Sequence, residues 1–138
     1  MSRKAIYRWV TLLFVLFAIG HTTGVLGTKD LPKEALDMRS AMFATHFKFM
    51  GTDSTYGGFL EGFGLVVTLF LLFSGFIAWT LGGLSKDNAR ATRPLAWGLA
   101  VAMLINAVLA FHYFFAGPVI LSVLIAAGIG LAESKPDH

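Results

Sequence analysis

The stretch GFGLVVTLFLLFSGFIAWTLGGLS, residues 62–85, decides the fold class, because its 24 residues include no charged side chain. About 20 apolar residues in a helix cross the roughly 30 Å hydrocarbon core of a bilayer. Two further charge-free stretches flank it, at residues 9–28 and 94–132. The chain is 56% hydrophobic and 14% charged, whereas a soluble domain averages roughly 25% charged residues. We therefore predict a single membrane domain, residues 1–138.

The stretch at residues 94–132 is too long for one membrane crossing. Gly117-Pro118 interrupts it, and proline disfavours a helical residue before it while suiting the first turn of a helix. We therefore predict two helices here, and an all-α fold in which an integral membrane four-helix bundle is the main feature. The four helices are predicted at about residues 7–27, 56–84, 94–116 and 118–132. A single helix kinked at Pro118 is the alternative for the last two.

Basic residues and tryptophans predict the orientation of these helices. Lys and Arg are enriched in cytoplasmic loops, and Trp prefers the membrane interface. Seven of the eleven basic residues precede the first helix, separate the second from the third or follow the fourth: Arg3, Lys4, Arg8, Lys86, Arg90, Arg93 and Lys135. Trp9, Trp79 and Trp97 fall at the same face. We therefore predict cytoplasmic termini; a cleaved signal peptide ending near Gly27 is the alternative for the first stretch.

The segment between the first two predicted helices, about residues 30–50, has a helical pattern of its own. Its apolar residues recur at helical spacing: Leu31, Ala35, Met38, Met42 and Phe49. Asp30 can cap a helix, and Pro32 suits the first turn. We predict an external amphipathic helix that ends near Met50 and either lies on the outer membrane surface or covers the bundle as a lid.

Few polar side chains fall within the predicted helices, and such residues usually face the interior of a membrane protein. In the predicted topology, His21, Glu61 and His112 all lie in the outer half of the bundle. We predict that they line a ligand site there. The other candidates come from the external segment and the second and third helices: His46, Lys48, Tyr56 and Asn106. The alternative roles are structural: Glu61 pairs with Lys48 or a histidine, and Asn106 joins two helices.

Two pairs of glycines suggest where helices come close. Gly20 and Gly24 lie four residues apart in the first helix, and Gly58 and Gly62 do so in the second. Residues four apart share a helix face, and small residues there let two backbones approach closely. We predict that these pairs pack the first two helices together, with a homodimer contact as the alternative.

Aromatic residues and glycines at the start of the second helix resemble those of a known family. The pattern is FKFMG at residues 47–51, followed by Tyr56, Phe59 and GFG at residues 62–64. With it the chain resembles a family of small bacterial four-helix membrane proteins without assigned function, and the similarity covers most of the chain. In that family an aromatic residue often follows the tyrosine, where this chain has Gly57. The resemblance implies four membrane helices in a bacterial inner membrane, and supplies no catalytic residues.

The sequence favours a non-enzymatic protein that binds a lipid-like or other small apolar ligand, or a protein partner, in the outer half of the bundle. It has no glycine-rich phosphate loop, HExxH motif or serine nucleophile elbow. It has no cysteine, and its net charge of +3 gives no reason to expect a nucleic-acid partner. No cofactor or metal is predicted.

Three alternatives stay open. His21 and His112 could bind haem or a metal between two helices. Glu61 and a histidine could act as an acid–base pair on a lipid or quinone-like substrate. A carboxylate such as Glu61 could also couple transport to protons.

Overall fold

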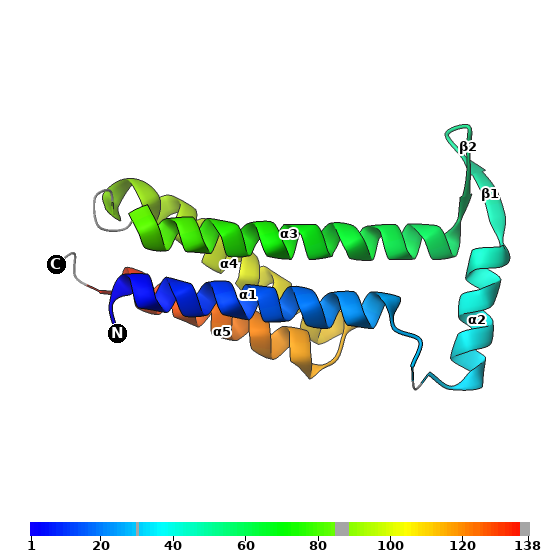
Figure 1. The fold of residues 1–138 in the computed structure, drawn as a ribbon, viewed down its shortest axis with the longest axis horizontal. Helices are drawn as coiled ribbons and strands as arrows, with labels where there is room; N and C mark the ends of the chain where they lie inside the picture. The colour runs from blue at the N-terminus through cyan, green and yellow to red at the C-terminus, as the bar shows by residue number, and fades with distance from the viewer. Residues whose placement is uncertain (30, 85–88, 136–138) are drawn as a thin grey trace. The chain divides into compact units, whose positions relative to one another are not determined.

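The computed structural model describes residues 1–29, 31–84 and 89–135 of the chain (Figure 1). Its elements in chain order are α1 (Arg3–Leu26), α2 (Lys33–Ala44), β1 (His46–Phe49), β2 (Thr52–Thr55), α3 (Tyr56–Leu84), α4 (Ala89–Tyr113) and α5 (Ala116–Glu133). The fold is helical, as predicted, and α1, α3, α4 and α5 are each long and apolar enough to cross a membrane. Asp30, the predicted helix cap, and Lys86, used to predict the orientation, lie outside the described residues.

The last charge-free stretch forms two helices, so the alternative of one kinked helix is wrong. The α4 helix ends at Tyr113 and α5 begins at Ala116, which places Pro118 in the first turn of α5, where its missing N–H costs no hydrogen bond. The α1 and α4 helices begin before the apolar stretches, at Arg3 and Ala89. Basic side chains can continue a helix past its apolar part because their charged ends reach water.

The segment after α2 forms a β-hairpin, so the predicted extension of the external helix to Met50 is wrong. The antiparallel strands β1 and β2 pair Phe49 with Thr52, which leaves Met50 and Gly51 as a two-residue turn. Both have positive φ, 50° and 85°, the combination that a type I′ hairpin turn requires. Phe49 therefore belongs to a strand and not to the apolar face of a helix.

The buried face of α2 also differs from the predicted one. Its half-buried residues are Ala35, Arg39 and Met42, whereas Met38 is exposed. An arginine thus lies in the middle of the face that packs. The helical spacing of apolar residues could not predict this position of Arg39. Such a pattern assigns apolar residues to the buried face and charged residues to the exposed one.

The described residues form two compact units. The core unit comprises the first part of the chain, to Ala18, and the part from Phe70 onward. The hairpin unit comprises Ile19–Leu69, which includes the end of α1, all of α2, β1 and β2, and the start of α3.

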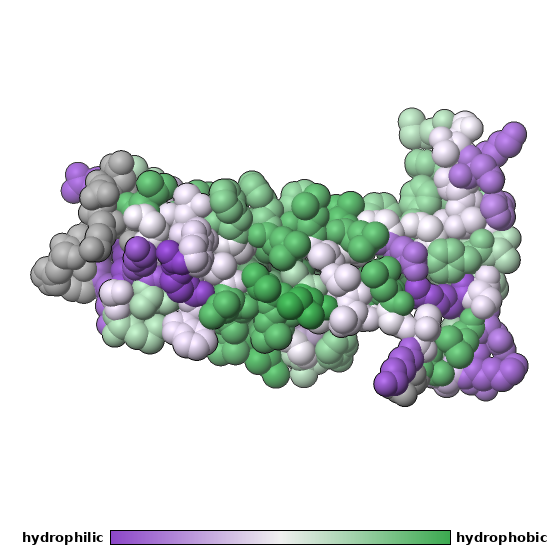
Figure 2. All heavy atoms as spheres, viewed as in Figure 1, coloured by the Kyte–Doolittle hydropathy of each residue, from purple (hydrophilic) through white to green (hydrophobic). Residues whose placement is uncertain are grey.

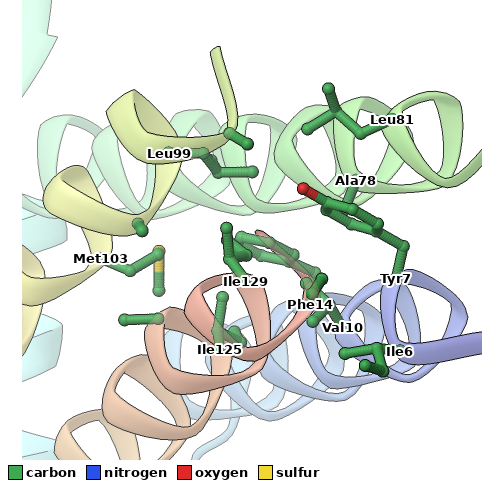
Figure 3. Packing of buried hydrophobic residues seen from close by; sticks show 14 of the residues in the cluster. Ile6, Tyr7, Val10, Phe14, Ala78, Leu81, Leu99, Met103, Ile125 and Ile129 are labelled. Carbon is green, nitrogen blue, oxygen red and sulfur yellow. The ribbon is translucent and has the colours of Figure 1, made fainter. Parts of the chain in front are cut away.

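A cluster of buried residues from α1, α3, α4 and α5 holds the core unit together (Figure 3). Its largest fully buried apolar side chains include Tyr7, Phe14, Ile125 and Ile129. Outside this cluster the same helices expose large apolar side chains, and Figure 2 shows their apolar surface in green. Such a surface on a helix is unusual for a protein that is surrounded by water.

Candidate functional site

A groove of about 580 Å³ lies in the hairpin unit. It is lined by residues from the hairpin and from one face of α3: His46, Asp53, Ser54, Thr55, Gly58, Phe59, Gly62, Phe63 and Val66. We call it the hairpin groove. The part on α3 is apolar, and the part on the hairpin is polar, so the groove is amphipathic along its length.

The polar part of the hairpin groove is organised by the strand register. His46 pairs with Thr55 across the ladder, so the two side chains project from the same face of the hairpin. The imidazole Nδ1 of His46 lies 2.8 Å from a carboxylate oxygen of Asp53. The Thr55 hydroxyl accepts a hydrogen bond from the backbone N–H of Gly58, at 3.0 Å, and so caps the first turn of α3.

Aromatic rings connect the hairpin to the start of α3. The ring of Phe47 lies 4.6 Å from that of Tyr56 and 5.7 Å from that of Phe59, measured between centroids. Phe49 meets Phe59 edge-on at 5.5 Å, and Phe59 lies 5.8 Å from Phe63. Three of these pairs are tilted and one is edge-on, and their centroid distances lie in the range that is favourable for aromatic pairs. The rings therefore fix the hairpin against α3, and two of them, Phe59 and Phe63, belong to the apolar wall of the groove.

The glycines of the predicted packing pairs do not contact a neighbouring helix. A Cβ added at Gly20, Gly24 or Gly62 would meet no atom of the described residues within 4 Å, and at Gly58 it would meet only the Thr55 hydroxyl. The prediction that these pairs pack the first two helices together is therefore wrong. Gly58 and Gly62 instead leave space in the hairpin groove. A homodimer contact through either pair stays a prediction.

Other glycines make the close contacts between α1 and α3. Within the hairpin unit, a Cβ at Gly64 would lie 2.6 Å from the side chain of Val25. Within the core unit, the corresponding Cβ at Gly75 would lie 3.1 Å from Phe14 Cβ, and at Gly82 2.8 Å from Tyr7 Cβ. Gly75 follows Gly64 by 11 residues, and Gly82 follows Gly75 by 7. These spacings are close to three and two helical turns, so the three glycines share one face of α3.

Glu61 forms an ion pair with Arg39 of α2, and not with Lys48 or a histidine as predicted. The Arg39 Nη2 donates to a carboxylate oxygen of Glu61, and the two side chains are 23% and 30% exposed. Arg39 Nη1 also donates to the carbonyl oxygen of Val25 near the end of α1, at 3.3 Å. One guanidinium thus joins α1, α2 and α3 within the hairpin unit.

The remaining predicted residues of the hairpin unit have separate roles. The His21 Nε2 lies 3.0 Å from the carbonyl oxygen of Gly64, so it joins α1 to α3. Lys48 is exposed and faces Asp53 across the ladder. Tyr56 is the first residue of α3 and stacks with Phe47.

His112 and Asn106 belong to the core unit. His112 is exposed, and its ring lies edge-on to Phe111 with 5.7 Å between centroids. The Asn106 amide donates to the buried hydroxyl of Ser122 at 2.8 Å, which joins α4 to α5, as its structural alternative predicted. The meeting of His112 with His21 and Glu61 at one site stays a prediction, since His112 lies in the other unit.

A buried carboxylate in the core unit was not predicted. Glu133 is 2% exposed, and both of its carboxylate oxygens accept hydrogen bonds from Arg3, at 2.6 and 2.7 Å. The Tyr7 hydroxyl also donates to this carboxylate. Arg93 of α4 donates to the Glu133 backbone carbonyl oxygen at 3.1 Å. This group, which we call the Glu133 cluster, joins the ends of α1, α4 and α5.

Comparisons with known proteins add no further assignment to these sites. No protein family, curated protein or solved structure matches the chain. Among residues 1–29, 31–84 and 89–135, no three His, Asp or Glu side chains come together in a way that could hold a metal ion.

The Arg39–Glu61 ion pair should stabilise the hairpin unit. In a double-mutant cycle, we expect Arg39→Ala and Glu61→Gln each to lower the free energy of unfolding by about 1–2 kcal/mol, because the pair is partly buried. The coupling between the two changes should be about 1 kcal/mol. The measurement is unfolding of the purified protein in mixed micelles, followed by circular dichroism.

The exposed pair of Lys33 and Asp37 on the same α2 helix is the matched control. Their nitrogen and oxygen lie 2.9 Å apart, with side chains 85% and 65% exposed. We expect a coupling below about 0.5 kcal/mol for this pair. A coupling at Arg39–Glu61 no larger than this value would mean that the ion pair does not hold α2 to the other helices.

Proposed function

We propose that the chain is an integral membrane protein whose four apolar helices form a bundle, and that its hairpin groove binds a lipid-like amphiphile. The main support for the proposal is the lining of the groove, which is apolar on α3 and polar on the hairpin. A single-chain lipid or a similar amphiphile has the same division into apolar and polar parts.

The exposed apolar surface of the helices supports the membrane part of the proposal. In the most apolar window of each candidate span, 22–33% of the residues are buried, so most of each window faces outward. Leaving large apolar side chains in water costs about 25 cal/mol per Å². The hydrocarbon core of a bilayer would shield these side chains from water. A helix is stable there because its backbone N–H and C=O groups bond within the helix.

The distribution of basic residues supports an orientation with both termini in the cytoplasm. Arg3, Lys4, Arg90 and Arg93 lie at the ends of α1 and α4, and such residues favour the cytoplasmic side. Crossing the membrane then puts α2 and the hairpin outside. The resemblance to small bacterial membrane proteins favours a bacterial inner membrane.

The chemistry of the hairpin groove favours a molecule with one apolar part and a polar end. Phe59, Phe63 and Val66 supply apolar surface on α3, which continues into the apolar part of the helix. His46, Asp53 and Ser54 offer hydrogen-bond donors and acceptors at the other end. The volume of about 580 Å³ lies within the roughly 300–1,000 Å³ of small-molecule sites. The bound molecule would therefore insert its chain along α3 and direct its polar end to the hairpin.

Filling the groove tests this proposal. We expect Gly62→Leu to reduce the lipid that stays bound to the purified protein by about tenfold, because the new side chain occupies the groove. The change should preserve the fold, since a Cβ at Gly62 meets no described atom within 4 Å. The measurement is native mass spectrometry of the protein after extraction from phospholipid vesicles.

Gly98→Leu in α4 is the matched control, because a Cβ there also meets no described atom within 4 Å and Gly98 does not line the groove. We expect it to retain lipid like the unchanged protein. Equal lipid retention by the two variants would contradict a binding role for the groove.

A further inference from the structure

Arg8 has an unusual environment in the core unit. Its guanidinium carbon lies 3.0 Å from the ring centroid of Trp79 on α3, so the cation stacks on the indole face. Its Nε is buried and has no hydrogen-bond partner among the described residues. A buried donor without a partner is unfavourable, so an acceptor that reaches the guanidinium would stabilise this arrangement.

Two other arginines of the core unit have a carboxylate partner, which Arg8 lacks among the described residues. Arg3 and Arg93 both approach the carboxylate of Glu133, with nitrogen-to-oxygen distances of 2.6 and 3.8 Å. Within the described residues, no ion pair includes Arg8. Arg3 and Arg93 thus share one carboxylate of the protein, whereas the guanidinium of Arg8 faces an aromatic ring.

The position of Arg8 determines what kind of anion could reach it. It lies in the second turn of α1, immediately before the exposed Trp9 and the apolar stretch. In a membrane, a residue at this position lies near the boundary between hydrocarbon and headgroups, where lipid phosphates are found. A guanidinium presents several N–H donors in a planar fork that matches two phosphate oxygens, and a ring stacked on its face leaves the edge of the fork free for them.

We propose that Arg8, oriented by Trp79, binds a phosphate ester anion, and that the source of this anion is the headgroup of an acidic phospholipid. This site is separate from the hairpin groove and would favour one class of lipid around the core unit. The inference rests on the membrane embedding of the proposed function, but not on ligand binding in the groove.

The test compares lipid selectivity in vesicles of equal parts phosphatidylglycerol and phosphatidylcholine. The protein is extracted, and the lipids that remain bound are identified by native mass spectrometry. We expect enrichment of phosphatidylglycerol, which Arg8→Gln lowers by about tenfold, the loss that one charge-assisted contact represents. Arg8→Lys keeps the charge without the fork and should retain part of the enrichment.

Lys4→Gln is the matched control, since Lys4 is an exposed basic residue on the same helix. It removes the same charge and should change the enrichment far less. An equal loss of phosphatidylglycerol enrichment in Lys4→Gln and Arg8→Gln would mean that net charge alone causes the enrichment, and it would overturn the proposal. Unchanged enrichment in Arg8→Gln would overturn it as well.

Two further readouts separate the possible causes of failure. Inorganic phosphate added during extraction should not displace the lipid if the headgroup is the ligand. Displacement by phosphate alone would assign the site to free phosphate, and it would overturn the proposal that a lipid supplies the anion. Flotation of the vesicles shows whether the protein is embedded. Failure to float would contradict the membrane proposal itself, whereas flotation without phosphatidylglycerol enrichment would contradict only the Arg8 site.

Discussion

Replacing Glu133 with glutamine should lower the free energy of unfolding by about 3–5 kcal/mol, the cost of breaking a buried ion pair from one side. The carboxylate is 1% exposed and accepts two hydrogen bonds from Arg3. An amide removes the negative charge and one acceptor oxygen, so the guanidinium of Arg3 loses this carboxylate partner in a largely buried place. Unfolding by SDS in mixed micelles, followed by circular dichroism, measures the change.

Two control variants isolate the cause. Glu34→Gln removes an exposed carboxylate from the first turn of α2 and should cost less than about 1 kcal/mol. Tyr7→Phe removes only one hydrogen bond to Glu133 and should cost about 1–2 kcal/mol, because the ion pairs remain. A Glu133→Gln protein as stable as Glu34→Gln would show that the Glu133 cluster does not stabilise the fold.

The helices could be predicted because the signal for them is local. A charge-free stretch of sufficient length and a proline that interrupts it are properties of neighbouring residues, and α3 begins and ends at the residues predicted, Tyr56 and Leu84. The hairpin was missed because its turn, Met50-Gly51, lacks the Asn-Gly or Asp-Gly pair that usually marks a type I′ turn. Helical spacing of apolar residues before it was the stronger signal.

The partners of charged residues could not be predicted because they depend on tertiary structure. Pairing with Lys48 or a histidine was the alternative role predicted for Glu61, but its partner is Arg39, which reaches it because α2 places that arginine on its packed face. Glu133 lies just after the last predicted helix, residues 118–132, and its main partner, Arg3, is 130 residues away in the sequence. No sequence pattern within a single helix contains this information.

Glycine-to-leucine changes at two adjacent positions of α3 should differ in their effect on stability. A Cβ at Gly82 would lie 2.8 Å from Tyr7 Cβ, which is fixed to the backbone of α1, whereas at Gly83 it would meet no described atom within 4 Å. Gly82→Leu should therefore destabilise by about 1–3 kcal/mol through overpacking. Gly83→Leu should be neutral or stabilise by up to about 1 kcal/mol, since leucine favours a helix more than glycine does.

The comparison between the Gly82 and Gly83 variants also tests which face of α3 contacts α1. Both variants add the same side chain one residue apart, so hydrophobicity and helix propensity change equally, and only the direction of the side chain differs. SDS unfolding of the two proteins under the same conditions gives the difference. If both changes destabilise equally, contact with α1 is not the cause. If only Gly82→Leu destabilises, the contact face of α3 is the one that contains Gly75 and Gly82, because only there does α1 come too close for a Cβ.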